Sequence, residues 1–153
     1  MKKNANKGFS LVELIIVIAI MAVLIGVLAP QFIKYVEKSK EAKDITNLDT
    51  CVEAVKIYYA DKDFPAGGVT ITAAKGSPLA STNGQDALKD AGCENSIITG
   101  SWSEDISAKV EADGKVTYGG KAKYYESDGT NGFKEPGKST STGTSTDSST
   151  SGS

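Results

Sequence analysis

One apolar segment, residues 9–33, constrains what this chain can fold into more than any other feature of its sequence. The segment contains a single charged residue, Glu13, and residues 14–29 contain no charged or strongly polar side chain. As an α-helix the segment would be about 37 Å long, at about 1.5 Å per residue. Because about 20 apolar residues are enough to cross a bilayer, the sequence predicts a membrane-spanning helix.

The flanks of this segment predict its orientation. Residues 1–8 carry three lysines and no acidic residue, which by the positive-inside rule places the N-terminus in the cytoplasm and the rest of the chain outside. A cleaved secretory signal is disfavoured, because its apolar core has about 7–15 residues and precedes a small-residue cleavage site. Here the apolar run is longer, and Ala29-Pro30 is a poor cleavage site. A simple signal anchor stays open.

Glu13 is the one charge in the apolar segment, and it needs a partner. A carboxylate deep in a bilayer costs on the order of 2.5–3.5 kcal/mol on insertion scales. A cut between Gly8 and Phe9 would create an amine at Phe9, and Glu13 and that amine could neutralise each other within one chain or between neighbours. The alternative is that Glu13 lies at the level of the lipid headgroups.

The sequence KGFSLVEL at residues 7–14 resembles the class III signal of the type IV pilin family, which includes pilins and the pseudopilins of type II secretion and DNA uptake. The match comprises the basic leader, Gly8 before the cut, Phe9 after it, and Glu13 as the fifth mature residue. The apolar helix that follows directly also matches. The resemblance covers residues 1–60, and beyond them it is architectural only.

This resemblance implies that the protein is the structural subunit of a type IV pilus. A prepilin peptidase would remove the leader peptide, residues 1–8, and methylate the new amine of Phe9. The apolar helices, residues 9–33, would then pack as the core of a helical homopolymer. Glu13 would set the register by pairing with the Phe9 amine of an adjacent subunit. The pilus assembly platform and its ATPase are the other implied partners.

The resemblance also implies where the protein works. Before assembly it would be a single-pass protein of the cytoplasmic membrane, with the N-terminus inside and the head outside. Afterwards it would be part of an extracellular filament that serves adhesion, twitching motility or surface colonisation. Two alternatives stay open: a pseudopilin of a type II secretion or competence apparatus, and a signal-anchored extracellular binding module.

Gly26 and Pro30 mark a weak point in the apolar helix. Proline lacks an N–H group and its ring clashes with the preceding turn, so Pro30 kinks or opens the helix. Glycine lowers local helix stability by about 1 kcal/mol relative to alanine. The family resemblance implies loss of helix here in the filament, over about residues 22–31, and a tolerated kink is the alternative.

After residue 33 the helix is expected to continue into a head, residues 34–137. Residues 34–44 carry charges of both signs, which favours a solvated helix with pairs three and four residues apart. The next residues form one apolar stripe on a helix that ends before Phe64-Pro65. Five residues make up this stripe: Ile45, Leu48, Val52, Val55 and Tyr59.

The stripe requires a cover, which the remaining head residues can supply. Asp113-Gly114 is a strong hairpin signal, and a short helix is expected at residues 84–91. The predicted fold class is therefore α+β: a long N-terminal helix packed against an antiparallel sheet of three or four strands. Five short segments have the character of strands: residues 69–72, 97–102, 106–111, 115–118 and 121–126.

Cys51 and Cys93 fall in the part of the chain placed outside the cell, where disulfides persist. A bridge between them would attach the connecting loop to the helix, and two free buried thiols are the alternative. The last segment, residues 138–153, is almost entirely Ser, Thr and Gly. It cannot bury a core, so its composition predicts a disordered tail.

The composition argues against several classes of function. The chain has no His and no Arg, which removes the usual general base near neutral pH and the bidentate phosphate clamp. Two Cys cannot build a four-ligand zinc site. The formal charge of −2 does not suit a nucleic-acid binder. We therefore expect no enzyme activity, no cofactor and no metal.

Overall fold

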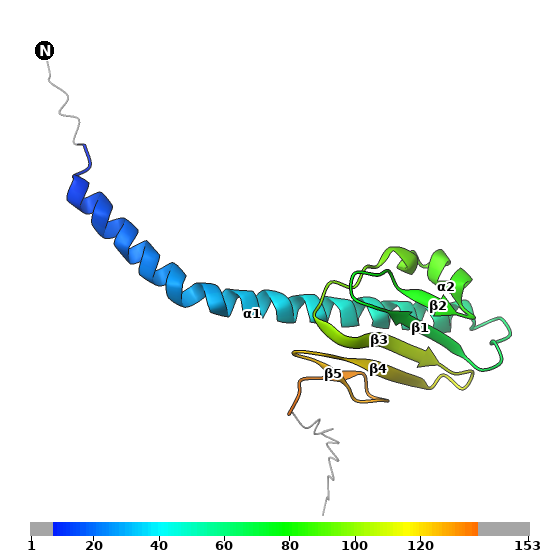
Figure 1. Cartoon of the computed structure of the whole chain (residues 1–153). Coiled ribbons are helices and arrows are strands. Elements are labelled where there is room, and N and C mark those ends of the chain that lie inside the picture. Colours follow the sequence, from blue (N-terminus) through cyan, green and yellow to red (C-terminus); the bar gives the residue numbers. More distant parts are fainter. Residues whose placement is uncertain (1–7, 138–153) are drawn as a thin grey trace, which may run out of the picture.

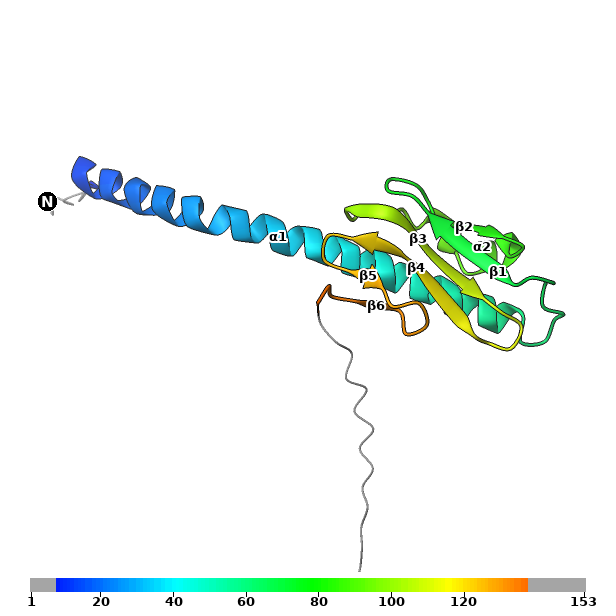
Figure 2. The ribbon, with the colours of Figure 1, turned by 60° about the horizontal axis from the view of Figure 1, so that its bottom comes forward.

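The computed structural model describes residues 8–137 of the chain. Its dominant element is α1 (Leu11–Tyr58), a helix of 48 residues. Residues 11–33, called the apolar half below, project away from the rest of the molecule, whereas residues 34–58, the outer half, lie against the head (Figures 1 and 2). The predicted single long helix is confirmed. The sheet packs against the outer half of that helix, as the α+β prediction requires.

Helix α1 is continuous through Pro30. The helix is not straight: Figure 1 shows that it bends between the blue and cyan parts of α1. A proline inside a helix removes one backbone hydrogen bond without necessarily ending the helix. The structure of the single subunit thus combines an unbroken helix with a bend.

The head is a six-stranded antiparallel sheet whose strands follow the order β2-β1-β3-β4-β5-β6. Between β2 and β3 lie the short helix α2 (Gln85–Asp90) and the 3-10 turn η1 (Cys93–Asn95). The strands are β1 (Val69–Ala73), β2 (Ala80–Thr82), β3 (Trp102–Val110), β4 (Val116–Ala122), β5 (Glu126–Ser127) and β6 (Phe133–Lys134).

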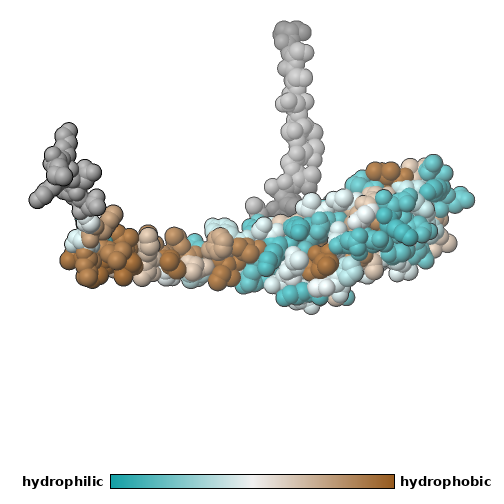
Figure 3. All heavy atoms as spheres, turned by 90° about the horizontal axis from the view of Figure 1, so that it is seen from above, coloured by the Kyte–Doolittle hydropathy of each residue, from teal (hydrophilic) through white to brown (hydrophobic). Residues whose placement is uncertain are grey.

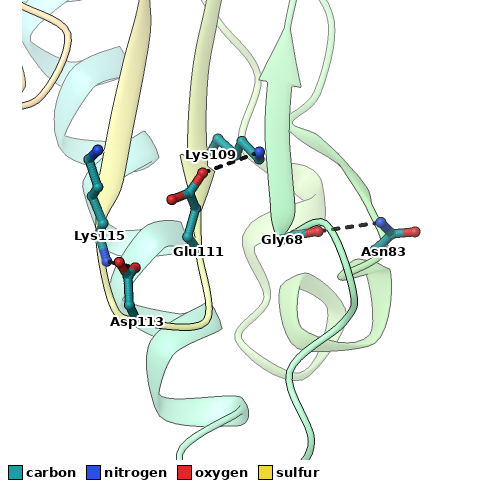
Figure 4. A network of polar contacts seen from close by, with 6 residues as sticks. All are labelled: Gly68, Asn83, Lys109, Glu111, Asp113 and Lys115. Carbon is teal, nitrogen blue, oxygen red and sulfur yellow. Dashed lines mark hydrogen bonds and ion pairs between the residues drawn. The ribbon is translucent and has the colours of Figure 1, made fainter.

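The hairpin between β3 and β4 turns at Asp113-Gly114, as predicted. The Lys115 amide donates to Asp113 Oδ1 at 2.9 Å, and Gly114 has φ 83°, a conformation that favours glycine. Beside the turn, Lys109 pairs with Glu111 at 3.3 Å (Figure 4). This end of the head is opposite the end from which the apolar half projects (Figures 1 and 2).

Two predicted strands differ from the structure. Residues 97–101 form only a single bridge, between Ile97 and Pro78, because the amides of Thr99 and Gly100 donate to Asp44 on α1 instead of to a neighbouring strand. The predicted strand at residues 121–126 is split by a turn between β4 and β5. The sheet also gains β2 and β6, so it has six strands and not three or four.

The hydrophobic core lies between the sheet and the outer half of α1. The predicted stripe supplies it: Leu48, Val52 and Val55 are fully or almost fully buried, and Ile45 and Tyr59 pack at its edge. Alternate residues of β1 and β3 face this stripe, because successive strand residues point to opposite sides of a sheet. The buried residues of these two strands are Val69, Ile71, Ala73, Trp102, Ile106, Ala108 and Val110.

Candidate assembly site

The predicted cleavage position lies in an exposed, non-helical segment just ahead of α1. Gly8, Phe9 and Ser10 are exposed and carry no regular secondary structure, and the Phe9 side chain is 89% exposed. Residues 1–7 of the predicted leader lie outside the described residues. Proteases cut preferentially in exposed segments without regular secondary structure. The Gly8–Phe9 bond lies in such a segment.

Glu13 has a partner within the chain. Its Oε2 accepts a hydrogen bond from the Ser10 amide at 2.9 Å, which closes the first turn of α1. A Ser three residues before a Glu at the start of an apolar run is the sequence signature of a capping box. This signal is present at Ser10–Glu13, but the sequence interpretation missed it. The carboxylate also lies in the first turn of α1, where acidic side chains stabilise a helix through its dipole.

The apolar half presents a hydrophobic surface on all sides. Its large apolar side chains, from Leu11 to Ile33, are each between 44% and 73% exposed. None of residues 11–33 is buried, and α1 is long and apolar enough to cross a membrane. Figure 3 shows this rod in brown beside the teal head. A surface of this kind requires a cover outside the chain, either lipid or other apolar helices.

Gly26 and Pro30 are one helical hydrogen bond apart. Pro30 has no N–H, so it cannot donate to the Gly26 carbonyl as another residue would in a regular helix. A Cβ atom placed on Gly26 would meet nothing within 4 Å. Packing within the subunit therefore does not require glycine at this position.

The outer half corrects the prediction of a solvated charged helix. Asp44 is fully buried and accepts hydrogen bonds from the Gly100 amide at 2.6 Å, the Thr99 amide at 3.0 Å and Trp102 Nε1 at 2.9 Å. A buried carboxylate is stable only when donors satisfy it. Asp44 thus binds the segment before β3 to α1, a role that helical charge patterning cannot reveal.

Other acidic residues of the outer half contact the turn between β4 and β5. Glu37 pairs with Lys123 at 3.0 Å, and this hydrogen bond lowers the pKa of Glu37. Glu41 is fully buried, and its Oε2 accepts from the Tyr124 amide at 2.9 Å. Its Oε1 has no hydrogen-bond partner among the described residues, and burial raises the pKa of this carboxyl.

The structure brings the two cysteines together without a bond between them. Cys51, on α1, and Cys93, at the start of η1, are both buried free thiols. Burial is the main cause that raises the pKa of Cys51, and a side-chain contact with Cys93 adds to it. The disulfide stays a prediction. The two thiols lie next to each other, which a disulfide requires, and both are reduced in the structure.

The described residues contain no cluster of three or more His, Cys, Asp or Glu that could hold a metal ion. The predicted tail, residues 138–153, lies outside the described part of the chain.

Comparison with known proteins tests the resemblance directly. Residues 3–29 match the motif described as the prokaryotic N-terminal methylation motif. Prepilin peptidase-dependent protein A of Clostridium perfringens is 33% identical over an alignment of 96 residues that covers 58% of this chain and 68% of that protein. The chain belongs to the type IV pilin family. This pilin is also similar to the type IV major pilin protein PilA of Myxococcus xanthus, with 41% identity over 58 residues, 38% of this chain and 26% of that protein.

A third relative is the type IV major fimbrial protein FimA of Dichelobacter nodosus, 33% identical over an alignment of 92 residues that covers 48% of this chain and 59% of that protein. The pilin thus spans about a quarter to two thirds of the lengths of these relatives. No solved structure gives a significant match. Because the family consists of structural subunits, the prediction that the protein is not an enzyme is confirmed.

Proposed function

We propose that this pilin is the structural subunit of a type IV pilus and polymerises through the apolar half of α1. The observation that carries the proposal is that every residue from 11 to 33 is exposed and that no part of the described chain covers them. A bilayer provides this cover before assembly, and a bundle of identical helices provides it afterwards. The names of the related major pilins support the same function.

Assembly begins with processing of the precursor. A prepilin peptidase cuts between Gly8 and Phe9, removes residues 1–8 and methylates the Phe9 amine. The exposed segment at residues 8–10 supports this step, as does the name of the Clostridium relative, a prepilin peptidase-dependent protein. The leader carries Lys2, Lys3 and Lys7, so its removal also takes three positive charges away from the N-terminus.

Glu13 then exchanges one partner for another. In the single subunit its carboxylate accepts from the Ser10 amide. In the filament it pairs with the Phe9 amine of the adjacent subunit, because an unpaired carboxylate is strongly penalised between apolar helices. A charge pair is worth more there than in water, since the surroundings have a low dielectric constant. This pair sets the axial register of neighbouring subunits.

The weak point at Gly26 and Pro30 allows the helix to change on assembly. One backbone hydrogen bond is already missing there, so less free energy is needed to open the neighbouring turns. We propose that helix is lost between about residues 22 and 31 when the subunit leaves the membrane. A filament density map with unbroken helix through residues 26–30 would contradict this step.

The proposed path of the protein runs from the membrane to the cell surface. The precursor is a single-pass protein of the cytoplasmic membrane with its basic N-terminus inside and its head outside. The assembly platform and its ATPase drive extraction into the extracellular filament. Adhesion, motility or surface colonisation is the role of the finished filament.

One experiment tests the proposal. Filaments are sheared from cells that express the chain, and the N-terminus of the purified subunit is sequenced by mass spectrometry. The expected N-terminus is a methylated Phe9 in long filaments. An intact Met1, or a cut near Ala29, would overturn the proposal. Mature protein found only in a short structure within the envelope would instead indicate the pseudopilin function.

A further inference from the structure

A depression of about 460 Å³ lies where the apolar half of α1 meets the head. Most of its lining comes from the first turns after the apolar segment, and one residue comes from the turn between β4 and β5. That turn lies at the end of the head from which the apolar half projects (Figures 1 and 2). The lining residues are Gln31, Lys34, Tyr35, Lys38 and Tyr124.

The chemistry of this depression suits a phosphate. The described lining includes two ammonium groups, two phenol rings and one amide, and no carboxylate. Lys38 is held by Glu135, whereas Lys34 is exposed and has no ion pair among the described residues. The Tyr124 hydroxyl donates to Glu37 at 3.4 Å, so the donors left for a ligand are the Lys34 ammonium, the Tyr35 hydroxyl and the Gln31 amide. An ammonium beside a hydroxyl and an amide is a set that binds an anion bearing several oxygens.

The position of the depression selects the source of that phosphate. Lys34 directly follows Ile33, the last residue of the apolar segment, and Tyr35 is 70% exposed. Tyrosines gather at the headgroup level of a bilayer, and lysines extend their ammonium groups to the same level. When residues 9–33 span the membrane, the depression therefore opens toward the headgroups.

We propose that this depression binds the phosphate of an anionic phospholipid in the outer leaflet of the membrane. The inference rests on the proposed membrane insertion of the apolar half. A second copy of the chain is the competing occupant, but lipid surrounds the helix next to the depression before assembly. The lipid phosphate thus meets Lys34 without any further partner. Extraction of the subunit then breaks this contact.

The test compares lipid retention by the full chain. Protein in detergent is mixed with equal amounts of phosphatidylglycerol and phosphatidylcholine, and the lipids that stay bound are counted by native mass spectrometry. We expect about fivefold preference for phosphatidylglycerol, the factor that corresponds to one lysine near an anionic surface. Lys34→Gln should abolish the preference. A wild-type protein without preference would overturn the inference.

Lys40→Gln is the matched control, because Lys40 is exposed on the same helix, carries the same charge and does not line the depression. It should keep the preference. Equal losses in Lys34→Gln and Lys40→Gln would mean that general charge, not the depression, attracts the lipid, and would overturn the inference. Trp102 fluorescence verifies that both variants keep the folded head.

Two further outcomes separate this inference from the proposed function. Flotation of the chain with phosphatidylglycerol vesicles measures membrane insertion by itself. Failure to float overturns both proposals, whereas flotation without lipid preference overturns only the phosphate site. If Lys34→Gln keeps the lipid preference and abolishes filaments, the depression belongs to a contact between subunits, and the lipid assignment is wrong.

Discussion

The two halves of α1 have the same backbone and opposite surroundings. The outer half buries Leu48, Cys51, Val52 and Val55 against the sheet, whereas the large apolar side chains of the apolar half are all exposed. The outer half is stabilised by its packing against the sheet of the same subunit. The apolar half must gain its stability from a partner outside the subunit. The difference teaches that one continuous helix can contain a folded domain's core and, beside it, an assembly interface.

The strongest way to break this comparison is to remove the charge from the apolar half. Glu13→Ala should abolish sheared filaments, because the Phe9 amine of the neighbouring subunit loses its partner in an apolar core. The head should unfold with unchanged free energy, since the polar contact that Glu13 makes within the described residues is with Ser10. Filament yield after shearing is the measurement. Normal filament yield from Glu13→Ala would show that the pair does not set the register.

Glu104→Ala supplies the control for this experiment, because Glu104 is an exposed carboxylate on β3. It removes the same charge from the head and should leave filament yield unchanged.

The second prediction concerns Cys51 on the outer half and Cys93 at the start of η1. Closing a loop of about 40 residues with a disulfide stabilises a protein by about 4 kcal/mol in the chain-entropy model. We therefore expect the oxidised protein to lose about this amount on reduction, measured by urea unfolding with and without reductant. The double variant Cys51→Ala, Cys93→Ala should not respond to reductant. Two titratable thiols in protein unfolded without reductant would contradict the bridge.

A matched pair of leucines gives the third test. Leu48→Ala removes a fully buried side chain and should destabilise the head by about 2–5 kcal/mol, the range for such cavities. Leu24→Ala makes the same change at a side chain that is 53% exposed, and it should leave head unfolding unchanged. Urea unfolding in detergent, followed by Trp102 fluorescence, measures both. Similar losses in the two variants would contradict the division of α1 into two halves.

Sequence patterns predicted the parts of the fold that follow from periodicity. The stripe from Ile45 to Tyr59 repeats every three or four residues, so one face of the helix had to be buried. The hairpin at Asp113-Gly114 was predicted because few other residues adopt that turn. Both predictions are confirmed.

The missed features depend on contacts between distant residues. The strand at residues 97–102 fails because Asp44 binds the amides of Thr99 and Gly100, about 55 residues away in sequence. No local pattern in residues 34–44 distinguishes a buried carboxylate from a solvated one. The site differs again: Phe9 and Glu13 were found from their order in the motif, and the partners that we propose for them in the filament belong to neighbouring subunits. The cap on Ser10 was missed although its spacing is local.

The fourth prediction sharpens the correction in the outer half. Asp44→Ala leaves the amides of Thr99 and Gly100 and the indole of Trp102 without their acceptor. A buried donor left unsatisfied costs about 1–3 kcal/mol, so the free energy of unfolding should fall by at least about that amount. Asp61→Ala, at an exposed position, is the control. An unchanged free energy of unfolding in Asp44→Ala would show that water replaces the carboxylate without cost.

The smallest expected effect separates Glu41 from Asp44. Both carboxylates are buried, but Glu41 accepts a hydrogen bond from the Tyr124 amide through Oε2, and its Oε1 accepts none from the described residues. Burial raises its pKa above 4.5, and the nearby Glu37 adds to this, while Lys123 opposes it. The folded state thus binds this proton more tightly than the unfolded chain does.

The sign of the pH dependence follows from this difference. The stabilisation that Glu41 contributes is fully present below pH 4.5 and is lost as the pH rises through the raised pKa. Glu41→Gln keeps the shape of the side chain and does not titrate, so its unfolding free energy should fall less than that of the wild type over this range. Urea unfolding at a series of pH values measures the difference, with exposed Glu104→Gln as the control. Parallel curves for wild type and Glu41→Gln would mean that Glu41 is solvated, as the charge pattern of residues 34–44 had indicated.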